Sequence, residues 1–336
     1  MNNICILTSA HSPFDTRIFQ KEAKSLAKAG YDVTLIAQHD KDETVDGIRI
    51  IPLPEQKNRI KRMTRTVWTA YRKALQIDAD IYHFHDPELI PIGTLLKMSG
   101  KKVVYDVHED YPKSILTKHY IHPTVRILLS AVINIIEKLA SKWFNVIVTA
   151  TDGVQLRFLR HHSIVIHNYP IVNNYWISEI TKNVDPNVFK IIYPGVLAKN
   201  RGITQLIQAI ELSKKENIRL LLAGEFEPKE YGDFVKTLGG WNKVKYLGVI
   251  PYDNVQKELI RANLGIECSF LEPNYLYSES NKIFEYMSVG LPVLCSNLPR
   301  LKEIIEESQC GMCINPLNPE EIAGAIRSDM CRYGYK

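Results

Sequence analysis

The chain has 336 residues, of which 45% are hydrophobic and 24% are charged, and its formal net charge is +5. This length is more than one hydrophobic core usually supports, so two domains of about 150 residues each are expected. The near-average composition excludes disordered and fibrous classes of protein.

The first half of the chain predicts a Rossmann-like domain, in which helices cover both faces of a parallel sheet. The N-terminal segment lacks a charged stretch followed by a long apolar run, so we expect a first strand, no signal peptide and a cytoplasmic location. Short β-branched runs predict strands at 4–8, 32–37, 48–52, 81–85, 102–107, 146–150 and 164–167. Helical periodicity predicts helices at 16–29, 59–76, 87–98, 125–142 and 153–160.

Two of these helices have an unusual composition. Residues 1–170 carry 23 Lys and Arg against 17 Asp and Glu, a net +6, whereas residues 171–336 carry 19 against 20. Much of the excess lies in the segment 57–75, whose apolar positions at helical spacing are Ile60, Met63, Val67, Trp68, Tyr71 and Leu75. This helix fits either an anionic membrane surface or an ordinary packed helix with a solvated basic face. The segment 125–142 holds a ten-residue apolar run, too short to span a bilayer, and predicts a buried or membrane-grazing helix.

The second half predicts another Rossmann-like domain. Prolines and asparagines interrupt the alternation at 169–188 and indicate a linker. Strands are then expected at 190–193, 220–223, 244–247, 264–268, 292–296 and 312–315, and helices at 203–214, 229–238, 254–262, 281–289, 300–307 and 319–328. We therefore predict domains at 1–170 and 189–328, a linker at 171–188 and a short tail at 329–336. Open α/β sheets bind ligands at the carboxyl ends of their strands, so we expect the ligand in the crevice between the two domains.

The six cysteines are interpreted as reduced apolar residues, because no exporting segment carries them to an oxidising compartment. Cys310 and Cys313 have CxxC spacing, but no second pair of ligands stands nearby. No metal site is expected.

The loop at 193–202 has the composition of a phosphate-binding turn. Gly195 and Gly202 allow close backbone approach, Lys199 and Arg201 are cationic, and a helix N-terminus follows. The Walker and GxGxxG patterns are both missing, so an ordinary glycine turn is the alternative.

The segment SESNKIFEYMSVGLP at 278–292 is a stronger candidate. Ser280 or Asn281 can cap a helix that carries Lys282 in its first turn and Glu285 one turn further. Free N–H groups and a lysine suit a pyrophosphate, and a carboxylate suits the hydroxyls of a ribose. The alternative for Glu285 is a solvent-facing helix residue.

Histidines and acidic residues also stand at the carboxyl ends of predicted strands in the first half of the chain. They include His85, and His108 with Glu109, and each is either a hydrogen-bonded structural residue or part of a site. After the first strand come His11, Asp15 and Arg17. Asp15 can cap the next helix, whereas Arg17 opposes the dipole of that helix, so a bound anion or acceptor phosphate would account for it.

The stretch NKIFEYMSVGLPVLCSNLPRLKEII closely resembles the donor-binding segment of family 4 glycosyltransferases, enzymes of the GT-B fold that use nucleotide sugars. Five more segments are similar to that family in the same order, namely HSPFDTRIFQKEAKSLAKAGYDVTLIA, HFHDPEL, VVYDVHEDYP, HNYP and YPGVLAKNRGI. Six segments in order are more specific than any one of them.

The resemblance implies two facing Rossmann-like domains and a retaining transfer, without cofactor or metal, from a nucleotide-diphosphate sugar. The acceptor is expected to be a glycan or lipid-linked, as in bacterial surface polysaccharide or cell-envelope synthesis, at the inner face of the membrane. The residues implied as catalytic are His108 and Glu285. Donor-binding residues would be Gly195, Lys199, Arg201, Gly224, Glu225, Ser280, Asn281, Lys282 and Glu285. Acceptor-side residues would be His11, Asp15, Arg17, His85 and Glu109.

Two departures from the family keep other functions open. Tyr277 stands where the family has a glutamate, and Val196 stands where it often has an arginine. One alternative is a nucleotide-sugar 2-epimerase on the same scaffold, and another is a non-catalytic protein that binds a nucleotide sugar or a partner. Nucleic-acid binding is not expected, because one basic helix does not form a surface that recognises nucleic acid.

Overall fold

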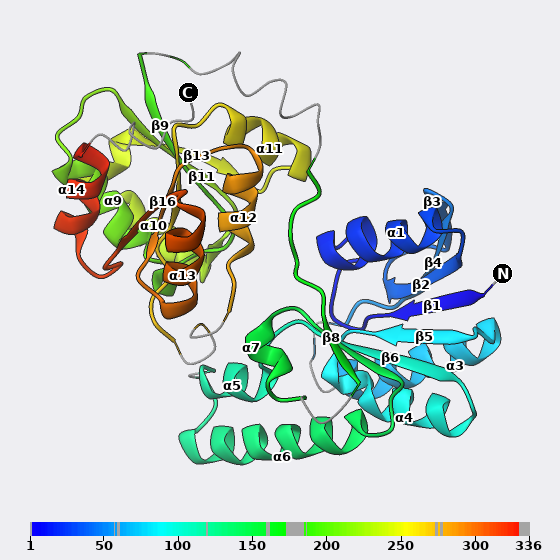
Figure 1. The fold of residues 1–336 in the computed structure, drawn as a ribbon. Helices are drawn as coiled ribbons and strands as arrows, with labels where there is room; N and C mark the ends of the chain where they lie inside the picture. Colours follow the sequence, from blue (N-terminus) through cyan, green and yellow to red (C-terminus); the bar gives the residue numbers. More distant parts are fainter. Residues whose placement is uncertain are drawn as a thin grey trace. The chain divides into compact units, whose positions relative to one another are not determined.

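The computed structural model describes residues 2–56, 58, 61–118, 120–158, 162–172, 185, 187–272, 275 and 278–328. The chain divides into unit 1, Met1–Asn168, and unit 2, Tyr169–Lys336 (Figure 1). The predicted linker at 171–188 lies mostly outside the described residues, and the predicted tail at 329–336 lies wholly outside them.

Unit 1 is built on an eight-stranded sheet with the order β3-β4-β2-β1-β5-β6-β7-β8. Only β3 pairs antiparallel, with β4. The chain order therefore reverses at β1, which places a topological switch point between β1 and β5. The strands are β1 Asn3–Leu7, β2 Asp32–Gln38, β3 Glu43–Val45, β4 Ile48–Leu53, β5 Ile81–Phe84, β6 Lys102–Val107, β7 Val146–Thr149 and β8 Ser163–Val165.

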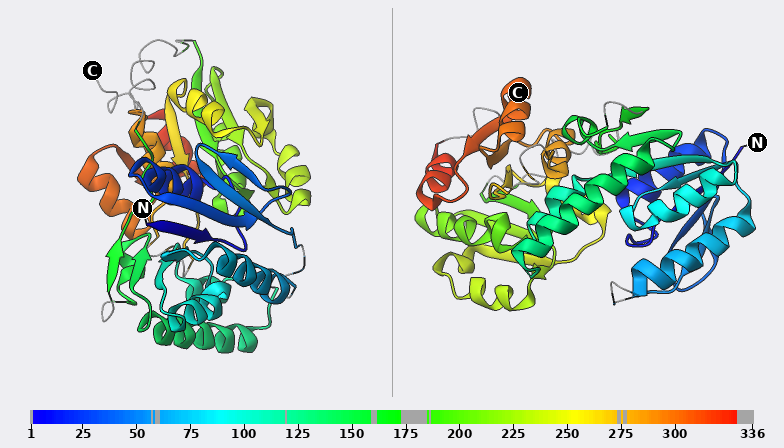
Figure 2. Two further views of the ribbon diagram at one scale, coloured as in Figure 1. Left: turned by 90° about the vertical axis from the view of Figure 1, so that its right-hand side faces the viewer. Right: turned by 90° about the horizontal axis from the view of Figure 1, so that it is seen from below.

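Helices cover both faces of this sheet, as Figure 1 and Figure 2 show. Successive side chains of a strand point to opposite faces. Ile4 and Ile6 of β1 therefore pack with the helix that contains Phe19, whereas Cys5 and Leu7 pack with the layer that contains Ala70. The helices are η1 Thr16–Ala23, α1 Lys24–Lys28, η2 Arg62–Thr66, α3 Val67–Ile77, η3 Pro87–Leu89, α4 Ile90–Met98, α5 Tyr111–Leu116, α6 Pro123–Ser141 and α7 Asp152–Gln155.

The structure shows which residues of two unit 1 helices are buried. In the basic helix, Val67, Ala70 and Ala74 are buried and Tyr71 packs against the same core, whereas Met63 and Trp68 are 51% and 52% exposed, so the predicted apolar face packs only in part. Along the long helix α6, Glu137 and Ser141 alone are buried, so of the two alternatives for this helix the membrane-grazing one stays open. Periodicity located both helices but did not show which side faces the protein.

Unit 2 has a six-stranded parallel sheet with the order β13-β11-β9-β14-β15-β16. Its switch point lies between β9 and β14. The strands are β9 Phe189–Pro194, β11 Ile218–Ala223, β13 Val244–Gly248, β14 Leu264–Glu267, β15 Val293–Ser296 and β16 Gly311–Ile314, and β10 Leu197–Ala198 pairs separately with β12 Phe226–Glu227.

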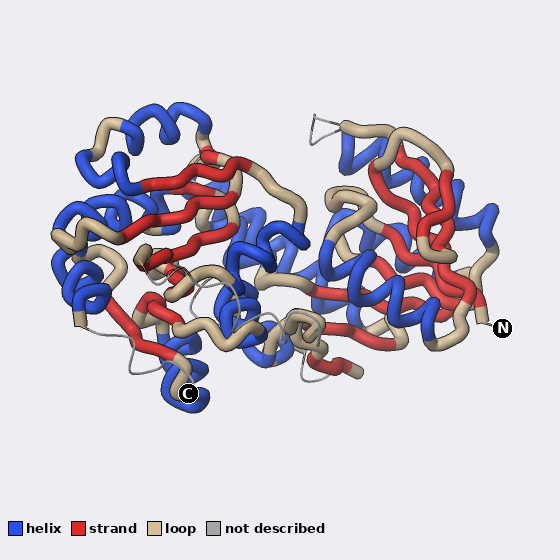
Figure 3. Tube along the Cα trace, turned by 90° about the horizontal axis from the view of Figure 1, so that it is seen from above, coloured by secondary structure: helices blue, strands red, loops and turns tan. Residues whose placement is uncertain are grey.

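Helices flank the unit 2 sheet, which Figure 3 shows in red among blue helices. They are η4 Lys199–Arg201, α9 Ile203–Leu212, α10 Lys229–Lys236, η5 Gly239–Lys243, α11 Tyr252–Ile260, α12 Asn281–Ser288, α13 Pro299–Ser308 and α14 Pro319–Arg327. Among the described residues of both units, none of the helices combines the length and apolarity that a membrane crossing requires.

Candidate active site

The loop after β1 is held at the switch point of unit 1 by Asp86, which follows β5. This buried carboxylate accepts hydrogen bonds from the Thr8 hydroxyl at 2.8 Å and the Ser9 backbone N–H at 2.6 Å. His11 Nε2 lies 3.5 Å from the other Asp86 oxygen. The carboxyl ends of β1 and β5 therefore form one rigid edge.

Asp15 caps the helix η1, as one of the two interpretations of this residue predicted. Its Oδ1 accepts from the backbone N–H groups of Arg17 at 2.8 Å and Ile18 at 3.0 Å. Burial tends to raise the pKa of Asp15, but bonds from His11 and the backbone lower it to about 2. The aspartate is thus ionised and committed to the loop structure.

Arg17 has buried carboxylate partners, which account for its charge without an acceptor anion, and its acceptor-side role stays a prediction. It is 5% exposed, and its Nη2 donates to both oxygens of Asp106 at 3.0 Å. Its Nε lies 2.9 Å from Glu22. Residues five apart lie on different sides of an α-helix, but η1 is a π-helix, whose wider turn brings Arg17 and Glu22 to one side.

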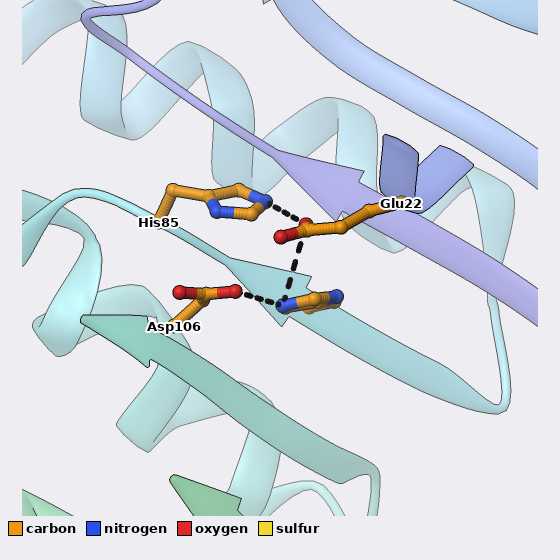
Figure 4. A group of neighbouring side chains, drawn as sticks. Glu22, His85 and Asp106 are labelled. Carbon is orange, nitrogen blue, oxygen red and sulfur yellow. Dashed lines mark ion pairs between the residues drawn. The ribbon is translucent and has the colours of Figure 1, made fainter. Parts of the chain in front are cut away.

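Further polar groups surround Arg17 inside unit 1. Figure 4 shows Glu22, His85 and Asp106 pointing toward one another. His85 Nε2 lies 3.4 Å from Glu22 Oε2, and His83 Nε2 lies 3.5 Å from Asp106 Oδ2. Burial and the charge of Asp106 raise the pKa of Glu22. Sequence analysis missed Glu22, His83 and Asp106, although an aspartate within the buried strand β6 is a signal of a buried polar network.

The His85 side chain is fully buried, and the acceptor contact expected of it stays a prediction. Its Nδ1 lies 2.9 Å from His108 Nε2 and so fixes the ring of His108. Burial lowers the pKa of His108 to about 4, against the pull of Asp106, so this imidazole is neutral at pH 7. His108 stays 17% exposed, its ring lies 5.2 Å from that of His11, and Glu109 is exposed beside it.

Two predicted glycines of unit 2 pack against each other at strand ends. Gly195 donates to the carbonyl of Ala223 at 2.8 Å. Gly224 has φ +150°, and a Cβ added there would lie 1.8 Å from the Gly195 carbonyl oxygen. A Cβ on Gly195 would contact Lys282 Cε at 3.1 Å. The close approach at these glycines is therefore between segments of the protein.

A cavity of about 280 Å³ lies at the switch point of unit 2. It brings together four predicted donor-binding residues, namely Arg201, Ser280, Asn281 and Lys282. Sequence analysis missed Glu267 and Ser269, which also line it. The other predicted donor-binding residues are outside its lining; they are Gly195, Lys199, Gly224, Glu225 and Glu285.

The N-terminus of α12 opens on this cavity. Ser280 occupies the N-cap position, but its side chain makes no capping bond and donates to Glu267 at 3.2 Å instead. Asn281 and Lys282 follow in the first turn and line the cavity. Uncapped N–H groups at a helix N-terminus bind anions.

The two cations of the cavity have different partners. Lys282 Nζ lies 2.6 Å from Glu267 Oε2. Burial tends to raise the pKa of Glu267, but Lys282 and Ser269 lower it to about 2, so the lysine is neutralised by an ionised partner. Arg201 donates to the Ser269 hydroxyl at 3.2 Å and lies over the ring of Tyr275. Over the part of the chain that the structure describes, no ion pair of Arg201 is found, although Glu267 attracts both cations, so Lys282 and Arg201 together outweigh this one carboxylate.

The remaining acids lie near this cavity or beyond it. Glu279 lines the cavity, and Arg300 donates to it at 2.7 Å and 2.9 Å, so this carboxylate is paired. Tyr277 lies outside the described residues. Glu285 is half-buried one turn into α12. It lies near Tyr252, whose pKa is raised to about 12 by burial and by this carboxylate.

Each unit matches the model of a glycosyltransferase domain family. Residues 16–169 match Glycosyltransferase Family 4, and residues 176–330 match Glycosyl transferases group 1. Solved structures share the complete fold. Sucrose-phosphate synthase from Thermosynechococcus elongatus has a TM-score of 0.76 at 15% identity, covering 99% of this chain and 91% of that one. HepE of Anabaena, in complex with UDP and glucose, has a TM-score of 0.72 at 16% identity, covering 99% and 92%.

The chain thus has the GT-B fold, and each of its two units matches a glycosyltransferase domain family. An uncharacterized glycosyltransferase of Methanocaldococcus jannaschii is 29% identical over 148 residues, 44% of this chain and 37% of that protein. The O-antigen chain mannosyltransferase B of Escherichia coli is 28% identical over 142 residues, 40% of this chain and 35% of that protein. The matched stretch thus spans little more than a third of each relative.

Proposed function

We propose that the protein is a retaining glycosyltransferase that moves a sugar from a nucleotide-diphosphate sugar to a glycan or lipid-linked acceptor in bacterial surface polysaccharide or cell-envelope synthesis. The strongest support for the proposal comes from one observation. The N-terminus of α12 is left uncapped beside Arg201, in a cavity at the switch point of unit 2. Helix N–H groups and an arginine together stabilise a diphosphate leaving group without a metal ion.

The proposed mechanism uses the residues of each unit separately. Arg201 and the first turn of α12 hold the diphosphate, and Glu285 accepts hydrogen bonds from the ribose. The bond between the anomeric carbon and the phosphate oxygen breaks, and the acceptor oxygen attacks from the same face. Its proton passes to the departing phosphate oxygen. His108, neutral at pH 7, orients the sugar or the acceptor through a hydrogen bond.

Donor binding tests the assignment of the cavity. Thermal-shift screening with UDP, GDP and their sugars should identify the donor, because a ligand of the folded state raises its stability. The UDP in the HepE structure and the mannosyltransferase name make both nucleotides good first probes. Arg201→Ala should weaken binding about 10- to 100-fold, as expected for loss of a charge-assisted bond. Lys236→Ala, an exposed change on α10, serves as the control. Unchanged binding by Arg201→Ala would contradict the assignment.

Turnover tests the proposed reaction. Glu285→Ala should reduce transfer at least about 100-fold while the melting temperature stays near that of the wild type. Product anomers determined by NMR should keep the configuration of the donor. Incubation of the donor without acceptor should give no isomer, since an isomer would indicate an epimerase instead.

The basic helix supports membrane association, which we propose for the inner face of the membrane. Lys61, Arg65 and Arg72 are exposed, and the Arg72 guanidinium lies 5.7 Å from the exposed Trp68 ring. Contact of this kind with anionic lipid weakens as salt screens the charges. Arg65→Glu with Arg72→Glu should therefore remove the salt-sensitive part of vesicle binding. Arg62 is unsuitable for this test because it pairs with Glu88 at 2.8 Å.

A further inference from the structure

Helix α6 turns its polar side toward unit 1. Polar residues recur every three or four positions along one stripe, and these are Arg126, Ser130, Asn134, Glu137 and Ser141. Arg126 and Ser130 donate to two backbone carbonyls of α5, those of Leu116 and Pro112, both at 2.8 Å. Glu137, completely buried, accepts from the Tyr105 hydroxyl at 2.8 Å and pairs with Arg157.

The apolar side of α6 faces outward. Its large side chains are 40% to 64% exposed, among them Ile127, Leu128, Leu129, Ile135, Ile136 and Leu139. A helix on the surface of a globular protein normally has the reverse arrangement, with its apolar stripe against the core. A contiguous exposed apolar face of this kind marks an interaction surface.

The inner contacts fix this orientation. Rolling α6 to bury its leucines would expose Glu137 and separate it from Tyr105 and Arg157. Burial raises the pKa of Glu137, and Arg157 at 2.5 Å opposes that shift. A buried carboxylate left without its partners is strongly unfavourable, so the outward face stays apolar.

The charges and aromatic residues around the face identify its partner. Within residues 120–143 the only acid is Glu137, which is buried, whereas Lys138 and Lys142 are exposed. Tyr120 and Trp143, 67% and 61% exposed, stand at the two ends of the helix, where aromatic side chains fit the headgroup level of a bilayer. A second copy of the same face would bring lysines together and offer no carboxylate to pair with them.

The helices beside α6 in the same layer also favour an anionic membrane as the partner. Helix α4 contacts both α3 and α6, so the basic helix and the apolar helix lie in one layer of unit 1. Figure 1 shows α3, α4 and α6 on the same face of the sheet. Met98 at the end of α4 is 70% exposed.

We propose that α6 is an in-plane membrane helix, with its outward face among the acyl chains of an anionic bilayer and its lysines at the phosphate level. At 19 residues and with this polar stripe it lies on the membrane and does not cross it. The inference stands on the contacts of α6 and goes beyond the proposed reaction. It assigns to α6 the insertion of apolar side chains into the bilayer, a contribution to binding that salt does not weaken. The salt-sensitive attraction to anionic lipid is left to the basic helix.

The test is flotation of the full chain with phosphatidylglycerol–phosphatidylethanolamine vesicles in 0.1 M and 0.5 M NaCl. Leu128→Gln, Ile135→Gln and Leu139→Gln are combined in one variant. A matched variant carries Leu212→Gln, Phe234→Gln and Val249→Gln, three exposed apolar positions of unit 2. We expect the α6 variant to lose roughly tenfold or more of its vesicle binding at both salt concentrations. The matched variant should float like the wild type.

Two results would overturn the proposal. One is equal flotation of the α6 variant and the wild type in high salt. The other is a wild-type dimer in analytical ultracentrifugation that the α6 variant lacks, without vesicle binding by either, since a second copy would then cover the face. Both variants should keep the wild-type thermal shift with the donor nucleotide, so failure of membrane binding is distinguishable from failure of the proposed reaction.

Discussion

His108 should make unit 1 sensitive to acid. Its pKa is about 4 in the folded protein, against an ordinary histidine pKa of 6.5, so the unfolded chain gains this proton first as the pH falls. The free energy of unfolding therefore falls between pH 6.5 and 4, by about 2 kcal/mol over the first 1.5 pH units. His108→Gln should show a smaller fall in its urea midpoint between pH 7 and pH 5. The exposed His122→Gln should follow the wild type, and identical pH dependence of all three proteins would refute this role.

The site residues and the loops that hold them were largely predictable from the sequence, but their ion-pair partners were not. The sequence pointed to Arg17 and Lys282 as cations near an anion, and the structure pairs them with Asp106 and Glu267. These acids lie on other strands, 89 and 15 residues away along the chain. Sequence spacing cannot show that a strand end faces a particular helix turn. Arg201 shows the opposite outcome, since the predicted cation lines the cavity.

At the scale of the element, the end of β11 depends on glycine at 224. A Cβ there would collide with the Gly195 carbonyl oxygen, and φ is +150°. Gly248 has φ +66°, and a Cβ would meet nothing within 4 Å. Gly224→Ala should therefore cost on the order of 3 kcal/mol or more, and Gly248→Ala about 1 kcal/mol. Chemical denaturation measures both, and the prediction fails if the two variants are equally stable.

Strands and helices were largely visible in the hydrophobic pattern, because a buried parallel strand needs an apolar run. Small elements escaped it. The strand β3 and the helix α5 were not predicted, and neither was the π-helical form of η1. The helix α6 shows why periodicity alone is insufficient. A helix has an apolar and a polar stripe whichever side faces the sheet, and only the contacts of Glu137 show that the polar stripe lies inside.

At the scale of the whole molecule, the shared order of the strands around the first strand of each sheet explains why both candidate sites lie where they do. In each unit, successive strands are added first on one side of the first strand and then on the other, so the switch point lies at β1–β5 and at β9–β14. Loops diverge at such a point, which leaves room for polar groups and for a ligand. Alternation of strands and helices made this architecture predictable.

Metal ions should have little effect on the rate of transfer. Glu22, His83, His85 and Asp106 offer ligand atoms within 4.8 Å of one another, a set that could hold a divalent cation. Arg17 already contacts both carboxylates, at 2.9 Å and 3.0 Å, and so supplies the positive charge that an ion would bring. In unit 2 the leaving group would be neutralised by Arg201 and the α12 N-terminus. We therefore expect EDTA to change the rate of transfer by less than about twofold. A larger loss, restored by added Mg²⁺ or Mn²⁺, would show that a metal takes part, and Arg17→Lys would then tell whether unit 1 holds it.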